Sequence, residues 1–100
     1  MIPQKTIAEL INRHSILEKD LSAGKIEKKL FAEKSKEYSD LNEIVEIAKK
    51  YISFEKNKEE LEKILQEKNS DKELKKMAEK ELNNLKSENE KNEIKLKLFI

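Results

Sequence analysis

The chain has 100 residues, of which 43% are charged and 5% aromatic, and its net charge is +1. This length allows one domain, and a composition rich in Lys, Glu and Leu with one Gly and one Pro favours long helices over sheet. Regularly spaced apolar residues argue against full disorder, which is the competing interpretation at this charge content. The absence of Cys excludes a disulfide framework and a Cys-ligated zinc, and no apolar run is long enough for a signal peptide or a membrane span.

Charged residues are spread evenly along the chain. Residues 1–25 carry four basic and three acidic groups, residues 26–68 carry ten and eleven, and residues 69–100 carry eight and seven. Because no segment forms a basic arm, the sequence gives no strong electrostatic case for nucleic acid as an autonomous target.

A first helix is predicted over residues 3–22. Pro3 suits a first helical turn, and Thr6 followed by Glu9 offers a capping box as an alternative start. Gly24, the one Gly of the chain, follows where a left-handed residue commonly ends a helix. One face of this helix is marked by Ile7, Leu10, Ile11, His14, Leu17 and Leu21.

A second helix is predicted over residues 26–68, with a length of roughly 64 Å at 1.5 Å per residue. Its first part carries two overlapping apolar stripes, which predict two helical partners there. Its last part keeps one narrow stripe, which predicts a single partner. The wide region contains Phe31, Tyr38, Leu41, Ile44, Val45, Ile47, Ala48, Tyr51, Ile52 and Phe54, and the narrow one contains Leu61, Ile64 and Leu65.

A third helix is predicted over residues 71–98. Ser70 and Glu73 form a capping box at its start, with the Ser70 hydroxyl accepting from the amide of Glu73. Alternation of apolar residues with Lys at 94–98 has the period of a strand, so helix and strand remain alternatives there. The apolar seam contains Leu74, Met77, Ala78, Leu82 and Leu85 and is interrupted by Asn89 and Asn92.

These elements predict an all-α fold with a single helical domain over residues 1–100. The three helices are expected to form a bundle at one end, from which residues 55–85 project as a long antiparallel hairpin. The apolar ending Leu98-Phe99-Ile100 suggests that the chain is the N-terminal part of a longer protein.

Catalysis by this chain alone is not expected. His14 is the one His, and with no second His or Cys to converge on it the favoured role is a core histidine. Carboxylate pairs are numerous, but a thin helical hairpin offers no desolvated site to shift a pKa. No catalytic, metal or cofactor site is therefore predicted.

Lys72, Lys76 and Lys80 form a candidate contact surface. Their spacing of four residues places them on one ridge of the third helix, where like charges cost about 0.2–0.5 kcal/mol per pair. A solvated face in a Lys-rich protein is the favoured interpretation. The alternative is a ridge that contacts the phosphates of ribosomal RNA.

Three segments resemble the N-terminal domain of bacterial peptide chain release factor 1. Residues 71–82, DKELKKMAEKEL, match the run D-x-E-L-x-x-M-A-x-x-E-L of that domain. Residues 31–41, FAEKSKEYSDL, resemble its F…SKEY-x-x-L segment, and Leu10, Arg13, His14 and Leu17 fit its first helix. The absence of Trp favours the factor that reads UAA and UAG over its UGA-reading sibling.

The resemblance implies a cytoplasmic factor that acts in translation termination. Its Gly-Gly-Gln hydrolysis loop and its Pro-x-Thr codon-reading element are absent here, so no catalytic or codon-reading residue is carried over. What it implies for this domain is a positioning role near the stalk base of the large ribosomal subunit, with rRNA, ribosomal protein and the remaining domains of the factor as partners. It implies no membrane and no small-molecule substrate.

Two departures from the family pattern leave a bacterial and an organellar origin open. The connection from Leu21 to Phe31 is short, and Lys72 stands where Pro is often found. Two other function classes also remain as alternatives: an RNA-binding helical arm like that of seryl-tRNA synthetase, and a generic coiled-coil interaction module. The balanced charge argues against the first, and the three matched segments argue against the second.

Overall fold

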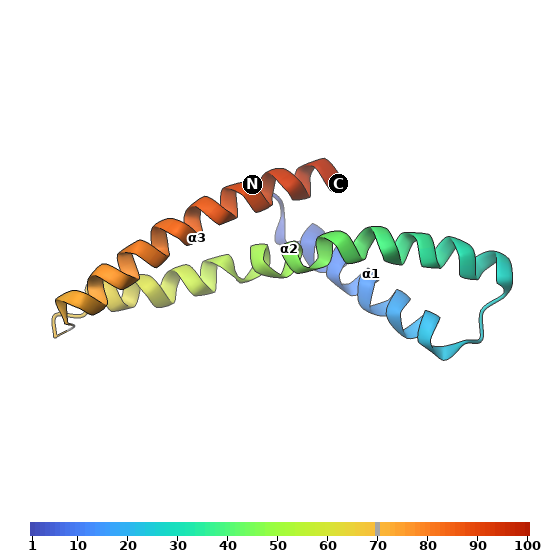
Figure 1. Ribbon diagram of the computed structural model, residues 1–100, viewed down its shortest axis with the longest axis horizontal. Helices are drawn as coiled ribbons and strands as arrows, with labels where there is room; N and C mark the ends of the chain where they lie inside the picture. The colour runs from blue at the N-terminus through green and yellow to red at the C-terminus, as the bar shows by residue number, and fades with distance from the viewer. Residues whose placement is uncertain (70) are drawn as a thin grey trace.

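In the computed structural model, which describes residues 1–69 and 71–100, the chain forms three α-helices (Figure 1). Helix α1 spans Gln4–Ala23, α2 spans Lys28–Gln66 and α3 spans Lys72–Phe99. The all-α class is confirmed, and each helix limit lies within two residues of its predicted position.

The molecule is an elongated rod built on α2. Its extents are 61 × 26 × 20 Å, and its radius of gyration of 18.4 Å exceeds the roughly 13 Å of a compact domain of this length. Helix α1 runs antiparallel to the first part of α2, and α3 runs antiparallel to its last part (Figure 1). Two hairpins therefore extend in opposite directions, and both chain ends lie near the middle of the rod.

The three helices meet at the middle of α2. Ile7 of α1, Ile44 and Ala48 of α2, and Leu96 of α3 form one buried cluster together with Ile2. The sequence predicted this meeting at one end of the molecule. Because α3 has 28 residues and α2 has 39, α3 is shorter by about 16 Å and does not reach the start of α2.

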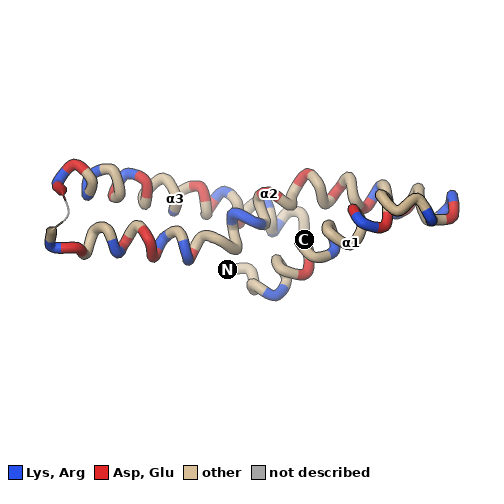
Figure 2. The backbone as a smooth tube through the Cα atoms, turned by 90° about the horizontal axis from the view of Figure 1, so that it is seen from below, with Lys and Arg blue, Asp and Glu red and all other residues tan. Residues whose placement is uncertain are grey.

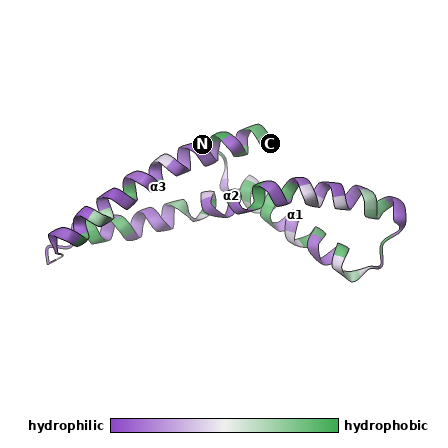
Figure 3. Cartoon of the chain, in the orientation of Figure 1, coloured by the Kyte–Doolittle hydropathy of each residue, from purple (hydrophilic) through white to green (hydrophobic). Residues whose placement is uncertain are grey.

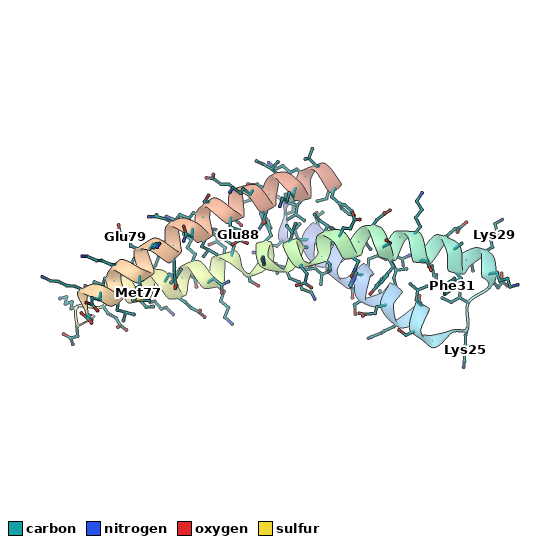
Figure 4. The ribbon with its side chains drawn as sticks, in the orientation of Figure 1. Lys25, Lys29, Phe31, Met77, Glu79 and Glu88 are labelled. Atoms are coloured by element: carbon teal, nitrogen blue, oxygen red, sulfur yellow. The ribbon has the colours of Figure 1, made fainter. Side chains whose placement is uncertain are left out.

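One expected core residue, Phe31, is 47% exposed. It was predicted to be buried because it lies in the stripe of α2 that faces α1. Helices α1 and α2 diverge toward their connecting loop (Figure 1), and Phe31 lies on the part of α2 near that loop (Figure 4), so α1 leaves it half exposed. Figure 3 shows hydrophobic residues gathered where α1 crosses α2 and in the last turns of α3.

The helix ends follow local chemistry. Gly24 has φ +68°, the left-handed conformation predicted for it. At the start of α3, Asp71 Oδ1 accepts from the amide of Glu73 at 3.3 Å, so Asp71 is the N-cap. The predicted cap, Ser70, lies outside the described residues. At the other end α3 continues as a helix to Phe99, which decides against the strand alternative at 94–98.

Candidate functional site

The candidate surface lies at the tip of the α2–α3 hairpin. Ala78 and Leu82, with exposed fractions of 2% and 8%, form the seam toward α2. At 100° per residue, Lys72, Lys76 and Lys80 lie about 120–160° around α3 from Ala78, on the side away from α2. All three are exposed, and none forms an ion pair within residues 1–69 and 71–100. The structure thus places the three predicted lysines on one open face.

Acidic residues accompany these lysines on the same helix. Figure 2 shows the two signs of charge interspersed along all three helices. Residues 71–82 contain four basic and four acidic groups, so the tip has no net charge. Any attraction for an anion therefore depends on the alignment of the lysines along one ridge rather than on the total charge of the tip.

Two apolar residues of the tip are exposed. Leu74 is 45% exposed and Met77 is 60% exposed, although the sequence assigned both to the seam. They lie about 40° and 100° from Ala78 around α3, so they form a flank beside the seam rather than its centre. Figure 4 shows Met77 and Glu79 projecting from opposite sides of the helix. The tip thus combines a lysine ridge with an apolar flank.

Between the tip and the central core, a groove of about 350 Å³ separates α2 from α3. Asn89 Oδ1 lines it, is buried, and has no hydrogen-bond partner in the described part of the chain. Both carboxylates at the groove are exposed and paired with lysines, Glu46 with Lys49 and Glu88 with Lys50. Asn89 therefore interrupts the apolar seam with a polar side chain. Neither carboxylate of the groove is shielded from solvent as a general base would need to be.

His14 has the structural role predicted for it. It is 9% exposed, and its ring stacks on Tyr38 with centroids 4.8 Å apart and an interplanar angle of 19°. His14 Nε2 lies 3.0 Å from Asn42 Oδ1, where it donates a hydrogen bond when it carries the proton. The imidazole is thus held by two residues of α2.

Next to this stack, Arg13 forms a two-point contact with Glu37. Arg13 Nε lies 2.7 Å from Glu37 Oε2, and Nη2 lies 3.2 Å from Oε1. These hydrogen bonds lower the pKa of Glu37 and raise that of Arg13. A two-point contact with a carboxylate needs the planar guanidinium of Arg, because the ammonium of Lys is a compact point charge. This requirement accounts for the one Arg in a chain that otherwise uses Lys.

The N-terminus is fixed by contacts that helical periodicity did not reveal. The Met1 ammonium lies 2.8 Å from Glu93 Oε1, and the Ile2 amide donates to Tyr51 Oη at 3.1 Å. The hydrogen bond from the ammonium, with a further contribution from the charge of Lys97, lowers the pKa of Glu93. These contacts join the first residues to α2 and α3 and hold Ile2 in the core.

Metal-binding clusters and membrane-spanning helices are both absent from residues 1–69 and 71–100. No group of three or more acidic, His or Cys side chains is placed to hold a metal ion there. In the same part of the chain, no helix is long and apolar enough to cross a membrane.

A family model for the PCRF domain matches residues 10–100. The chain belongs to the peptide chain release factor family. It is 65% identical over 100 residues to peptide chain release factor 1 of Pelagibacter ubique (strain HTCC1062), and this match covers the whole chain and 28% of that protein. It is 36% identical over 74 residues to the same factor of Orientia tsutsugamushi (strains Boryong and Ikeda), covering 74% of the chain and 20% of each relative. No solved structure matches.

Within this release factor domain, most residues that carry the family resemblance have structural roles. Arg13 pairs with Glu37, and His14 stacks on Tyr38, so the first two matched segments contact each other. In the third segment, Asp71 caps α3 while Ala78 and Leu82 form its seam. Leu74 and Met77 are matched residues of that segment with large exposed fractions. Phe31 of the second segment is exposed as well, so packing leaves Leu74 and Met77 at the tip and Phe31 near the other hairpin unexplained.

Proposed function

We propose that this domain positions a release factor on the ribosome during translation termination at UAA and UAG codons. Its site of action is near the stalk base of the large subunit, in the cytoplasm. The chain spans 28% of the length of its Pelagibacter ubique relative, so codon reading and peptidyl-tRNA hydrolysis belong to the remainder of the factor. The domain itself performs no chemistry and requires no cofactor.

The observation that carries this proposal is the free lysine ridge at one end of a 61 Å rod. Lys72, Lys76 and Lys80 are exposed and have no ion-pair partner among the described residues. A ridge of this kind fits the phosphate backbone of an RNA helix, where each neutralised phosphate releases counterions. The exposed Met77 beside it supplies an apolar contact to ribosomal protein or to an unstacked base.

The shape of the domain also supports a positioning role. Both chain ends lie near the middle of the rod, so the hairpin tip extends away from the point where further domains are attached (Figure 1). The 39-residue α2 is continuous from one hairpin to the other, which makes the tip a rigid extension of the centre. A contact at the tip therefore fixes the orientation of whatever is joined to the centre.

Co-sedimentation of the domain with ribosomes tests this proposal. We expect the triple variant Lys72→Glu, Lys76→Glu, Lys80→Glu to weaken binding by about tenfold or more, since it replaces three phosphate contacts with repulsion. The matched control reverses three exposed lysines around the other hairpin, Lys25→Glu, Lys28→Glu and Lys29→Glu (Lys25 and Lys29 are labelled in Figure 4). Both triples change the net charge equally.

The outcomes of this comparison separate the alternatives. Loss of binding in the tip triple alone supports the ridge. Equal loss in both triples means that net charge alone governs binding and overturns the ridge. Equal binding of the domain to ribosomes and to unrelated structured RNA favours a general RNA-binding arm, and no sedimentation at all rejects autonomous ribosome binding.

A further inference from the structure

The groove between α2 and α3 continues toward the hairpin tip. A second cavity of about 430 Å³ adjoins the first one of about 350 Å³, and the two share Asn57, Leu85 and Glu88 as lining residues. We call the two cavities together the hairpin groove. Its apolar residues are all half-buried, although they lie where the two helices meet: Phe54, Leu61, Ile64 and Leu85. Two helices thus leave one side of their apolar seam open, and a third helix would close it as in a bundle.

The hairpin groove and the lysine ridge lie on different sides of α3. At 100° per residue, the groove residues Glu81, Leu85 and Glu88 lie about 20–80° from Ala78 in one direction around the helix. The centre of the groove is therefore about 140° from the centre of the lysine ridge. A partner in the groove and an anion on the ridge can consequently be bound at the same time.

Two carboxylates line the half of the groove nearer the tip, one from each helix. Lys50 pairs with Glu88, and ten residues further along α2 the antiparallel register brings Glu60 beside the turn of α3 that holds Glu81. Neither Glu60 nor Glu81 forms an ion pair within residues 1–69 and 71–100. Two like charges over an apolar floor favour a cationic side chain in the groove and disfavour an anionic one.

The other half of the groove needs a hydrogen-bond donor. Asn89 Oδ1 is buried there and has no hydrogen-bond partner in the described part of the chain. Leaving a buried acceptor unsatisfied is costly, and a donor from a bound partner would remove this cost. The four charged residues that line this half are paired with one another, Glu46 with Lys49 and Glu88 with Lys50. The two halves therefore select for different groups, a cation near the tip and a neutral donor near the centre.

We propose that the hairpin groove binds an amphipathic, cationic helix of a partner protein. Its apolar stripe packs on Leu61 and Leu85, its Lys or Arg side chains pair with Glu60 and Glu81, and a polar side chain donates to Asn89 Oδ1. The groove extends along α3 from position 81 to position 92, about 16 Å, which a helix of three to four turns covers. RNA is excluded as the occupant, because the two carboxylates repel phosphate.

Nuclear magnetic resonance of ¹⁵N-labelled residues 1–100, titrated with three synthetic peptides, tests this proposal. The first peptide is an amphipathic helix with a Leu stripe, flanking Lys residues and one Gln. The second carries Glu in place of every Lys, and the third has the composition of the first in a scrambled order without a stripe. We expect the first to bind about tenfold more tightly than either of the others. Its binding should shift the side-chain amide signals of Asn57, Asn84 and Asn89 and leave the backbone amides of the lysine ridge unchanged.

A matched pair of double variants tests the role of the carboxylates. Glu60→Gln with Glu81→Gln should weaken binding of the cationic peptide about tenfold, since both ion pairs are lost. Glu59→Gln with Glu79→Gln changes the net charge equally at exposed positions that do not line the groove and should leave binding unchanged. Figure 4 shows Glu79 and Met77 projecting from opposite sides of α3.

Several results would overturn the proposal. Equal binding of the cationic and anionic peptides, or equal weakening by both double variants, means that the groove carboxylates do not select the partner. Binding of the scrambled peptide as tight as that of the first means that no helical stripe is recognised. Shifts of the groove signals that grow with protein concentration before peptide is added mean that a second copy occupies the groove, and no shift with any peptide means that the groove binds no such helix. Because these measurements involve no ribosomes, their failure is distinct from failure of the lysine ridge in the sedimentation experiment.

Discussion

The guanidinium of Arg13 forms a bidentate contact with the carboxylate of Glu37, with N–O distances of 2.7 and 3.2 Å. The next residue on each helix repeats the pairing, since His14 stacks on Tyr38. Two adjacent residues of α1 thus meet two adjacent residues of α2. This double contact fixes how α1 and α2 are aligned along each other in the first hairpin. Apolar periodicity alone would also allow an alignment shifted by one helical turn.

The variant His14→Ala tests the importance of this register. The imidazole is 9% exposed and stacked, so its removal leaves a cavity and frees Asn42. We expect the free energy of unfolding to fall by about 2 kcal/mol, within the range of large-to-small changes at buried sites. Urea unfolding monitored by circular dichroism measures it. The exposed neighbour Ser15→Ala is the control, and equal values for both variants would contradict a structural role for His14.

A matched pair on α3 tests the central cluster. Leu96→Ala removes a fully buried side chain at which all three helices meet, and we expect it to destabilise the domain by about 3 kcal/mol. Leu98→Ala, two residues further on, removes a side chain that is 83% exposed and should change the stability of residues 1–100 by less than about 0.5 kcal/mol. Thermal or urea unfolding of both variants measures the two losses of unfolding free energy. Similar losses would mean that the two faces of α3 are packed alike.

The turn between α1 and α2 depends on the backbone of Gly24. Its φ of +68° disfavours any side chain, while no atom lies within 4 Å of the position that a Cβ would occupy. The expected cost of Gly24→Ala, about 1 kcal/mol in unfolding free energy, is therefore conformational and not steric. Gly24→Asn, which tolerates the left-handed region better, should cost less. Equal losses for Ala and Asn would point to some other cause.

Acid should weaken the contact at the N-terminus. The pKa of Glu93 lies below its ordinary value near 4.5, chiefly because the Met1 ammonium donates to its carboxylate. A depressed carboxyl pKa contributes stability above the unfolded-state value, and this contribution is lost as the pH falls through the folded-state value. Unfolding free energies measured between pH 6 and pH 3 should therefore fall more steeply for the natural chain than for Glu93→Gln. If the unfolding free energy falls equally with pH in both proteins, the contact between Met1 and Glu93 does not stabilise the fold. Acetylation of the N-terminus removes the ammonium charge and should therefore reduce the pH dependence of the natural chain, as Glu93→Gln does.

Much of the fold could be predicted because local chemistry marks the helix ends. Pro3, Gly24 and Asp71 lie within a residue of the observed limits of the helices. Periodicity also assigned the correct faces to Leu17 and Leu82. The predicted lengths of the second and third helices already imply that α3 ends beside the middle of α2, so the meeting point was wrongly inferred from correct helix limits. Periodicity could not show the angle between α1 and α2, and this is why the exposure of Phe31 differs from expectation.

The candidate site was predictable to a similar degree. The four-residue spacing of Lys72, Lys76 and Lys80 is enough to place them on one ridge of a helix. The sequence assigned Met77 to the seam, although its place about 100° around α3 from Ala78 puts it on the exposed flank. The ion pair between the Met1 ammonium and Glu93 could not be predicted from a local pattern, because it joins residues more than 90 positions apart.

The most direct test of the positioning role is the rate of peptide release by a full-length factor carrying Lys72→Glu, Lys76→Glu and Lys80→Glu. Release should be measured against factor concentration on ribosomes stalled at a UAA codon. We predict that the concentration needed for half-maximal release rises about tenfold or more while the maximal rate is unchanged, because the ridge contributes to binding and not to hydrolysis. An unchanged half-maximal concentration, or a lower maximal rate alone, would contradict the proposal that this tip positions the factor.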